Sequence, residues 1–232
     1  MKEEPFIKLS WMVYKKEMLK NIPLLTKEDP KKIYRNAKRL YKQELKQLEE
    51  YGTGDVLKFN LLYGIMIYTL VVSCETKPGV NELRQFCRNV VLTPKLARTF
   101  LAKTDMTCEK NIQHQIQLAE KSSNAAHPYT WQYKITEIGN KRFTAEFSRC
   151  GIYDYFKAKG LSELVPAICM MDFCYCEVQN HIFLRKETIA SGGKVCDCTY
   201  ISKDIASDDE WQEYQKDRKK ESQYGQKITG QY

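Results

Sequence analysis

Hydrophobic positions recur at helical spacing through the first half of the chain. Between residues 31 and 50, a lysine-rich segment carries apolar side chains near one face, at Ile33, Ala37, Leu40, Tyr41, Leu45 and Leu48. Gly52 and Gly54 then break the pattern, and Asp55 is expected to cap the helix that follows. That next helix holds the longest apolar run, residues 61–74, which is shorter than the roughly 20 residues that span a membrane. It is therefore expected to be a buried core helix.

Further helices follow the same periodicity. Pro78 and Gly79 mark a boundary, after which the spacing of Leu83, Phe86, Cys87 and Val90 predicts another helix. Thr93-Pro94 is typical of an N-cap followed by proline at the first helical position. A last amphipathic helix is indicated by Ile112, Ile116 and Ala119, and it ends in the polar residues 121–124.

From Tyr129 the hydrophobic period changes from helical to alternating. Trp131, Tyr133 and Ile135 alternate with polar residues, which predicts a strand, and Gly139-Asn140 supplies a turn to a second strand over residues 143–150. A helical stretch is expected over residues 162–178. Two more strands, 182–189 and 195–201, are expected to be joined across Ser191-Gly192-Gly193.

These elements predict an α+β fold in which a helical N-terminal half packs on a small antiparallel β-sheet with an inserted helix. We expect residues 1–125 to form the helical region and residues 126–202 the α+β region that carries the chemistry, both within one integrated domain. Residues 203–232 are polar and are expected to form a tail, either a frayed helix or disordered.

Composition limits the classes of partner. The chain has 232 residues and a net charge of +8, but its basic residues are interspersed with acidic ones along helical faces. It contains no zinc-finger, phosphate-loop or RNA-binding signature, so neither nucleic acid nor a membrane is an expected partner. The N-terminal sequence lacks the apolar stretch of a secretory signal, which favours the cytoplasm.

Cysteine usage points to chemistry in the C-terminal part. Six of the nine cysteines fall between residues 150 and 198. In a reducing compartment, such clustering is more typical of metal binding or catalysis than of disulfides. Cys74, Cys87 and Cys108 lie in helical, apolar surroundings and are expected to be structural.

An ordered set of short motifs runs from Phe147 to Tyr200. It comprises Arg149-Cys150 after a strand, a Gly160–Leu164 turn, Cys169 with Asp172, Arg185 with Thr188, Gly192, and Cys196-Asp197. In this order the segment resembles the L-2-amino-thiazoline-4-carboxylate hydrolase family. Cys198 departs from the pattern, because an aromatic residue is expected there.

The resemblance implies an enzyme that opens a cyclic C–N bond in a small carboxylic acid without an organic cofactor. The family is also distantly similar to vinyl-reductase-type ligand-binding domains, in which a glutamate and cysteines hold zinc. Arg185 and Thr188 stand where two of those ligands are expected. The resemblance therefore implies an anion-binding site in place of a metal site.

Opening such a ring requires a nucleophile, a proton carrier and a cation for the substrate carboxylate. We expect Cys150 or Cys169 to be the nucleophile, Asp172 the general acid/base and Arg185 the carboxylate clamp. Cys150 precedes a helix and follows an arginine, an arrangement that favours the thiolate. Substrate-binding residues are expected to be Arg185, Thr188, Cys196 and Asp197.

Two alternatives remain open from the sequence. The pairs Cys174/Cys176 and Cys196/Cys198 would supply zinc ligands to a non-catalytic metal or small-ligand sensor. An interaction protein would instead use the basic N-terminal helix against an acidic partner. The three histidines lie in no catalytic motif, and His181 is expected to be solvated at the start of a strand.

Overall fold

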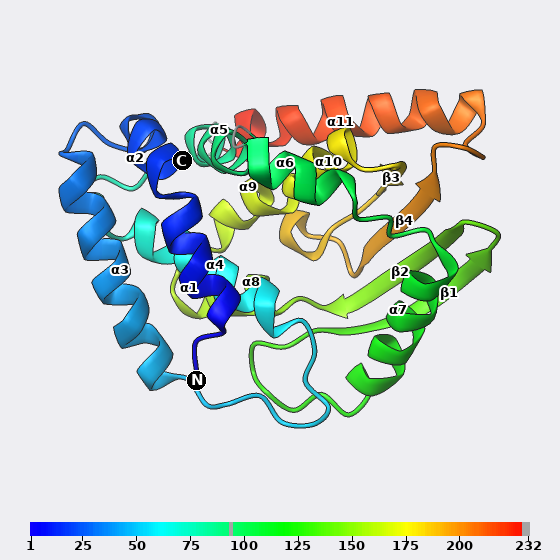
Figure 1. Ribbon diagram of the computed structural model, residues 1–232, viewed down its shortest axis with the longest axis horizontal. Helices are drawn as coiled ribbons and strands as arrows, with labels where there is room; N and C mark the ends of the chain where they lie inside the picture. The colour runs from blue at the N-terminus through cyan, green and yellow to red at the C-terminus, as the bar shows by residue number, and fades with distance from the viewer. Residues whose placement is uncertain (93–94, 229–232) are drawn as a thin grey trace.

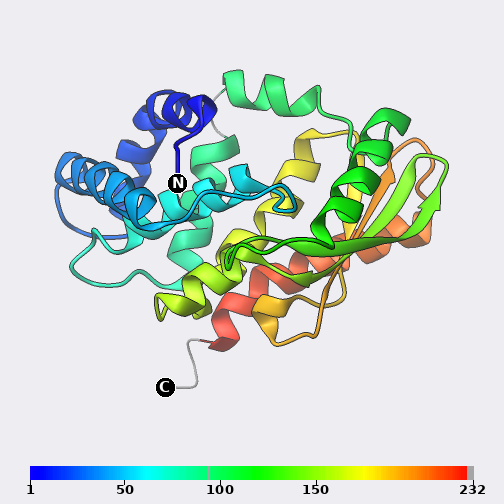
Figure 2. The same cartoon turned by 90° about the horizontal axis from the view of Figure 1, so that it is seen from below.

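The computed structural model describes residues 1–92 and 95–228 and has an α+β fold, as predicted. Most helices of the N-terminal half lie on one side of the molecule and a four-stranded sheet lies on the other, with the last of these helices packed against the sheet (Figures 1 and 2). The helices of the first half are α1 (Pro5–Val13), α2 (Lys15–Asn21), α3 (Pro30–Gln47), α4 (Lys58–Val71), α5 (Val80–Leu92), α6 (Lys95–Ala102) and α7 (Glu109–Ser122). The expected helix start at Thr93-Pro94 lies outside the described residues.

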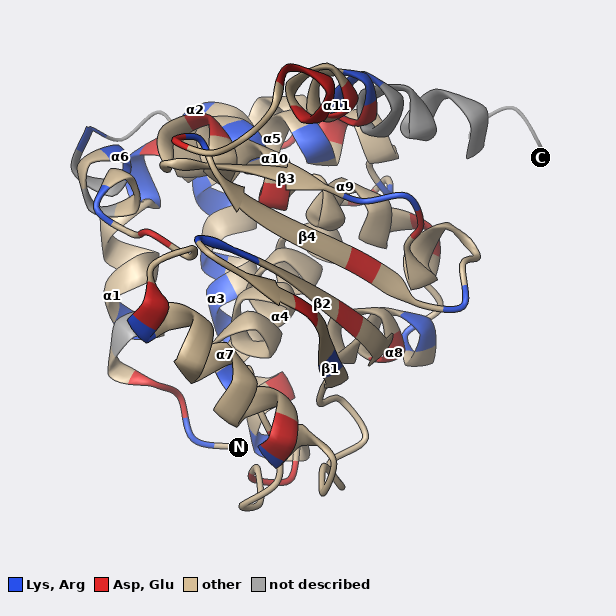
Figure 3. Ribbon diagram, turned by 90° about the vertical axis from the view of Figure 1, so that its right-hand side faces the viewer, with Lys and Arg blue, Asp and Glu red and all other residues tan. Residues whose placement is uncertain are grey.

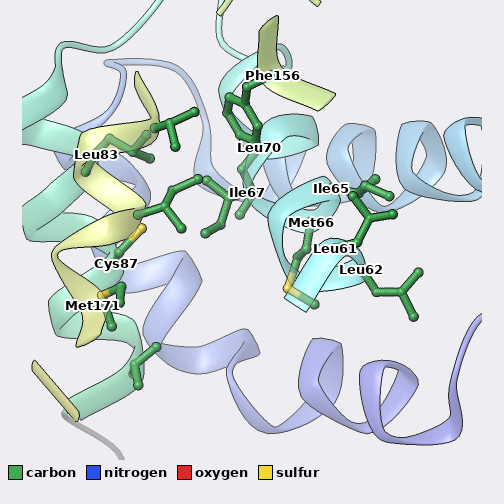
Figure 4. Packing of buried hydrophobic residues seen from close by; sticks show 14 of the residues in the cluster. Leu61, Leu62, Ile65, Met66, Ile67, Leu70, Leu83, Cys87, Phe156 and Met171 are labelled. Atoms are coloured by element: carbon green, nitrogen blue, oxygen red, sulfur yellow. The ribbon is translucent and has the colours of Figure 1, made fainter. Parts of the chain in front are cut away.

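The core of the helical half is built around α4. Its side chains pack against those of α5, α8 (Gly151–Ala158) and α10 (Met171–Val178), as Figure 4 shows for residues such as Leu70, Leu83 and Phe156. The run 61–74 thus forms the predicted buried helix over most of its length. No helix within the described residues has both the length and the apolar character needed to cross a membrane.

Helix α3 shows how the amphipathic pattern is used. The carboxylate of Asp29 accepts hydrogen bonds from the backbone N–H groups of Lys31 and Lys32 and so caps the helix. The apolar face of α3 is buried, whereas its basic residues lie on its more exposed side, coloured blue in Figure 3, where Lys32 pairs with Glu28 and Glu75 at 3.0 and 3.7 Å. The interspersed charges match the sequence interpretation of solvated helix faces.

The predicted cap at Asp55 is wrong. Helix α4 begins after Leu57, and the Asp55 carboxylate instead accepts hydrogen bonds from the N–H groups of Gly52, Ala126 and His127 at 2.7, 3.0 and 2.9 Å. Leu57 has a φ of 60°, in the left-handed region. Asp55 therefore ties the loop before α4 to the segment that leads into the sheet.

The sheet has the strand order β1-β2-β4-β3, and each neighbouring pair is antiparallel. Its strands are β1 (Gln132–Gly139), β2 (Arg142–Arg149), β3 (His181–Leu184) and β4 (Cys196–Ser202). The hairpin around Gly139-Asn140 is confirmed. The predicted strand 182–189 is too long, because the chain leaves the sheet after Leu184. In the β2–β4 register, Phe147 is opposite Cys196 and Ala145 is opposite Cys198.

The helical stretch expected over residues 162–178 is broken into three. A 3-10 turn, η2 (Ser162–Leu164), precedes α9 (Val165–Cys169), and Met170 separates α9 from α10. Cys169 and Asp172 therefore lie on two different helices rather than on one. Because of the break, Asp172 lies in the first turn of a new helix.

Part of the expected C-terminal tail belongs to the folded structure. Helix α11 (Asp208–Ile228) packs along β3, with Tyr214 stacked on Phe173 and only 4% exposed. Glu177 on α10 bonds both guanidinium nitrogens of Arg88 at 2.5 and 2.9 Å and pairs with Arg218 of α11 at 2.7 Å. These contacts join α5, α10 and α11.

His181 also departs from its expected environment. It is 1% exposed, and its ring lies 5.6 Å from that of Tyr200. Burial lowers its pKa to about 4. His181 is therefore a neutral core residue rather than a solvated one.

Candidate active site

A cavity of about 450 Å³ lies between the N-terminal helices and the sheet. Its described lining comes from both sides of the molecule. The helical half contributes Ser10, Tyr14, Leu57, Phe59, Asn60, Tyr63, Val91, Leu101 and Thr104. The later segments contribute Trp131, Phe147, Cys150, Ile152, Val165, Ile168, Cys169, Met171, Asp172, Tyr175, Gln179, Arg185, Cys196, Cys198 and Tyr200.

Five of the residues selected from the sequence line this cavity: Cys150, Cys169, Asp172, Arg185 and Cys196. They come from four separate places, namely the start of α8, the α9–α10 junction, the end of β3 and β4. The three thiols and the ion pair lie close enough to influence one another electrostatically. The fold therefore brings a carboxylate, a guanidinium and thiols to one partly enclosed cavity.

The centre of this group is an ion pair between Arg185 and Asp172. Nη1 of Arg185 donates to Oδ2 of Asp172 at 2.8 Å, and Nη2 donates to the carbonyl oxygen of Cys169 at 3.1 Å. The Arg185 side chain is 2% exposed, whereas that of Asp172 is 39% exposed. The carboxylate is thus the more accessible partner, and it lies at the positive end of α10.

Aromatic rings and α11 fix the guanidinium in place. The guanidinium carbon of Arg185 lies 5.3 Å from the ring centre of Phe173 and 5.1 Å from that of Phe183, within cation–π range. The backbone N–H of Arg185 donates to Oδ2 of Asp217 at 3.2 Å, and Asp217 is buried. Buried charges are stable only when they are paired and hydrogen-bonded, and these contacts meet that requirement.

The thiols do not have the thiolate character expected from the sequence. Burial raises the pKa of Cys150 to about 12, although the N–H groups of Tyr153 and Ile152 at the start of α8 act in the opposite direction. Burial likewise raises the pKa of Cys169 well above its usual value, against the opposing effect of Arg185. It also raises the pKa of Cys196. At Cys150 the effect of desolvation thus exceeds that of the helix terminus, in the direction opposite to the one expected from the sequence.

Thr188 and Asp197 lie outside the cavity lining. The Thr188 hydroxyl accepts a hydrogen bond from the Ser191 N–H and caps a short 3-10 turn. The Asp197 carboxylate accepts from the N–H groups of Lys186 and Glu187 at 3.0 and 2.8 Å. Both residues shape the loop between β3 and β4, and through it the position of Arg185.

Several residues of the site were not selected from the sequence. Trp131, Tyr175 and Tyr200 line the cavity, and Asp217 holds the backbone of Arg185 from α11. The spacing of Trp211, Tyr214 and Asp217 places them along one helical face, which is the signal in the tail that indicates a packed helix.

The part of the chain that the structure describes contains no set of zinc ligands of the kind that the zinc-binding alternative requires. No group of three or more histidine, cysteine or acidic side chains there is arranged to hold a metal ion. Cys174 is buried beside Arg88, whereas Cys196 and Cys198 face the cavity.

Together, the fold and the site define an α+β protein with a partly enclosed cavity that carries an ion pair and thiols. A family model described as L-2-amino-thiazoline-4-carboxylic acid hydrolase matches residues 59–200. The chain belongs to this family, whose name is that of a hydrolase. The match begins at α4, so it includes helical segments in which the sequence showed no motif of its own. Neither the curated proteins nor the solved structures include a match to this chain.

Proposed function

We propose that this protein is a hydrolase that opens a C–N bond in a small cyclic amidine-like carboxylic acid, of the 2-amino-thiazoline-4-carboxylate type. The observation that carries the proposal is the Asp172–Arg185 pair in the wall of a partly enclosed cavity. Such a substrate carries a cationic amidine and an anionic carboxylate, and the pair offers one charge complementary to each. Family membership supports the same reaction class.

Water is the nucleophile that the site favours. The raised pKa values of Cys150 and Cys169 keep both thiols protonated near neutral pH, so attack by sulfur would first require a costly deprotonation. Asp172 is a carboxylate at the cavity wall and is accessible enough to reach a water molecule. We therefore assign Asp172 as the general acid/base.

The reaction then balances as a hydrolysis. The water oxygen bonds to the amidine carbon of the ring while Asp172 accepts its proton. That proton passes to the ring nitrogen as the carbon–nitrogen bond breaks. The second water proton leaves the new hydroxyl as it becomes the carbonyl, so both protons end on the departing amine, which carries the positive charge of the former amidine. The products of this step are a primary amine and a carbonyl group at the former amidine carbon. In this proposal the substrate carboxylate takes the place of Asp172 on Nη1 of Arg185 when it binds, and Cys150, Cys169 and Cys196 form part of the wall.

The test is ring opening of 2-amino-thiazoline-4-carboxylate, followed by the appearance of a primary amine and a mass increase of one water. We expect Asp172→Asn to reduce kcat by at least a hundredfold, within the range of general acid–base effects. Arg185→Lys is expected to raise KM, because lysine retains the charge but loses the two-pronged geometry. Cys150→Ser and Cys169→Ser are expected to retain activity.

Asp154→Asn is the matched control for Asp172→Asn. Asp154 also pairs with an arginine, Arg149, at 3.2 Å and has a comparably exposed side chain, but it does not line the cavity. Full activity of Asp172→Asn would refute the acid–base assignment. Loss of activity in Cys150→Ser or Cys169→Ser, with the fold intact, would instead support covalent catalysis by that cysteine.

A non-catalytic ligand-binding protein is the second candidate. It is favoured by the protonated thiols and by the largely apolar lining of the cavity. This function predicts saturable binding of the ring acid without amine release, so equilibrium dialysis run beside the turnover assay separates the two candidates.

A further inference from the structure

Apart from the ion pair, the described lining of the cavity is mostly apolar. Its apolar members include Leu57, Phe59, Val91, Leu101, Trp131 and Phe147. Among the described residues that line the cavity, Arg185 is the only lysine, arginine or histidine. The cavity is therefore amphipathic, with a charged part and a larger apolar part.

The cavity is also large for a simple ring acid. At about 450 Å³ it falls within the range of roughly 300–1,000 Å³ typical of sites for drug-sized ligands. An amino-thiazoline carboxylate has only about nine non-hydrogen atoms, far fewer than such ligands contain. Bound at the ion pair, it would leave most of the apolar wall without contact partners, which forfeits dispersion and hydrophobic stabilisation.

Leu57 gives a second, independent sign that the apolar wall serves a ligand. It stands at the start of α4 with a φ of 60°, and a bulky residue in the left-handed region is an outlier that costs about 1–2 kcal/mol. Glycine or asparagine would adopt this conformation more readily. Strained residues of this kind cluster at ligand clamps, and the side chain of Leu57 lines the cavity.

From the volume, the lining and Leu57 together, we propose that the natural ligand is a cyclic amidine-like acid bearing an apolar substituent of about the size of a phenyl or hexyl group. The charged ring seats at Asp172 and Arg185, and the substituent packs against Leu57, Phe59 and Leu101. The proposal rests on the proposed function for the ring and its orientation. The apolar substituent itself follows from the cavity.

The experiment compares 2-amino-thiazoline-4-carboxylate with its phenyl-substituted and hexyl-substituted ring derivatives. Binding is measured by equilibrium dialysis and by the fluorescence of Trp131 in the cavity wall, and turnover is measured separately. We expect the substituted acids to bind at least tenfold more tightly than the parent acid. Equal or weaker binding of both derivatives would overturn the proposal.

The Leu57→Asn variant tests whether the higher affinity of the substituted acids comes from contact with the apolar wall. Asparagine tolerates the left-handed backbone, so the thermal midpoint is expected to be retained or raised. Affinity for the substituted acids should fall about tenfold, while affinity for the parent acid stays unchanged. A purely structural role for Leu57 would instead affect both ligands equally, which would count against the proposal. Ile205→Asn, at an exposed aliphatic residue outside the cavity lining, is the control and should leave all affinities unchanged.

Binding and turnover answer different questions in this design. Preferential binding of the substituted acids without hydrolysis of any ring would support the apolar site and refute the hydrolase. Hydrolysis of the parent acid with no binding preference for the substituted acids would support the hydrolase and refute the apolar site.

Discussion

Gly151 lies where α8 touches the segment leading into β1, and replacing it with alanine provides a direct test of the packing at the cavity wall. A Cβ atom added at this position would lie 2.3 Å from the carbonyl oxygen of Tyr129 and 2.8 Å from Cζ3 of Trp131. Both distances are well inside van der Waals contact. The Tyr129 carbonyl is held in turn by the Tyr51 hydroxyl, which donates to it at 2.6 Å.

The cost of Gly151→Ala follows from two opposing effects. Overpacking costs about 1–3 kcal/mol, and displacing the Tyr129 carbonyl weakens a hydrogen bond worth about 1 kcal/mol. Alanine is the better helix former, which offsets up to about 1 kcal/mol. We expect a net loss of about 2 kcal/mol in the free energy of unfolding, which for a domain of this size is a fall of about 4–8 °C in Tm.

Urea unfolding followed by circular dichroism measures the effect, with Gly52→Ala as the control. A Cβ atom at Gly52 would have its nearest neighbour, Oδ2 of Asp55, at an ordinary 3.5 Å, so this change should stay within about 0.5 kcal/mol of the wild type. Because Cys150 precedes Gly151 and Trp131 lines the cavity, Gly151→Ala should also lower kcat/KM.

A double-mutant cycle with Tyr51→Phe tests whether the loss of stability in Gly151→Ala comes from the clash with the Tyr129 carbonyl. Removing the hydroxyl lets the Tyr129 carbonyl move, so Gly151→Ala should cost about 0.5–1 kcal/mol less in the Tyr51→Phe background. Equal urea midpoints for Gly151→Ala and Gly52→Ala would refute the reasoning about this contact.

Three further predictions concern charge and ionisation. Glu177→Gln removes the shared partner of Arg88 and Arg218, so urea titrations should show a free energy of unfolding lower by about 1–2 kcal/mol. The control is Glu146→Gln, at a more exposed pair with Lys134, which should change the free energy of unfolding by less than about 0.5 kcal/mol. Because burial lowers the pKa of His181 to about 4, the unfolded chain binds a proton between about pH 6.5 and 4 that the folded chain does not. Stability should therefore fall by up to about 3 kcal/mol as the pH drops through that window, and His181→Phe should remove this dependence. Because burial raises the pKa of Cys150 to about 12, alkylation of Cys150 by iodoacetamide should be slow at pH 7.5, and its rate should rise about tenfold per pH unit. Peptide mass spectrometry measures the rate, and rapid labelling at pH 7.5 would instead show a thiolate.

Much of the fold was predictable because it depends on local periodicity. The apolar faces of α3, α4 and α7 and the hairpin between β1 and β2 are encoded by side-chain spacing and turn residues within each segment. The strand predicted over residues 182–189 was too long because its end is determined by a contact with a residue outside the segment. Residues 185–189 alternate acceptably for a strand, but Asp197 binds the N–H groups at 186 and 187 and takes them out of the sheet.

Part of the cavity lining was predictable from the sequence, whereas the electrostatics of the thiols were not. The order of motifs selected Cys150, Asp172 and Arg185, which line one cavity. Burial of the thiols depends on helices contributed by distant segments, so no local pattern indicates that their pKa values rise rather than fall. Asp55 shows the same limitation, because its partners at 126 and 127 are about seventy residues away in the sequence.

The bond from the backbone of Arg185 to Asp217 bears on how the protein is made. The helices and the sheet are synthesised first, and their residues can begin to pack while the ribosome is still at work. The guanidinium of Arg185 has to enter a dry interior, yet a carboxylate that secures its backbone is supplied only when α11 has been translated and has left the exit tunnel. The candidate active site is thus among the last parts of the molecule to be completed, and a nascent chain stalled before residue 217 should bind the ring acid weakly even with its sheet in place.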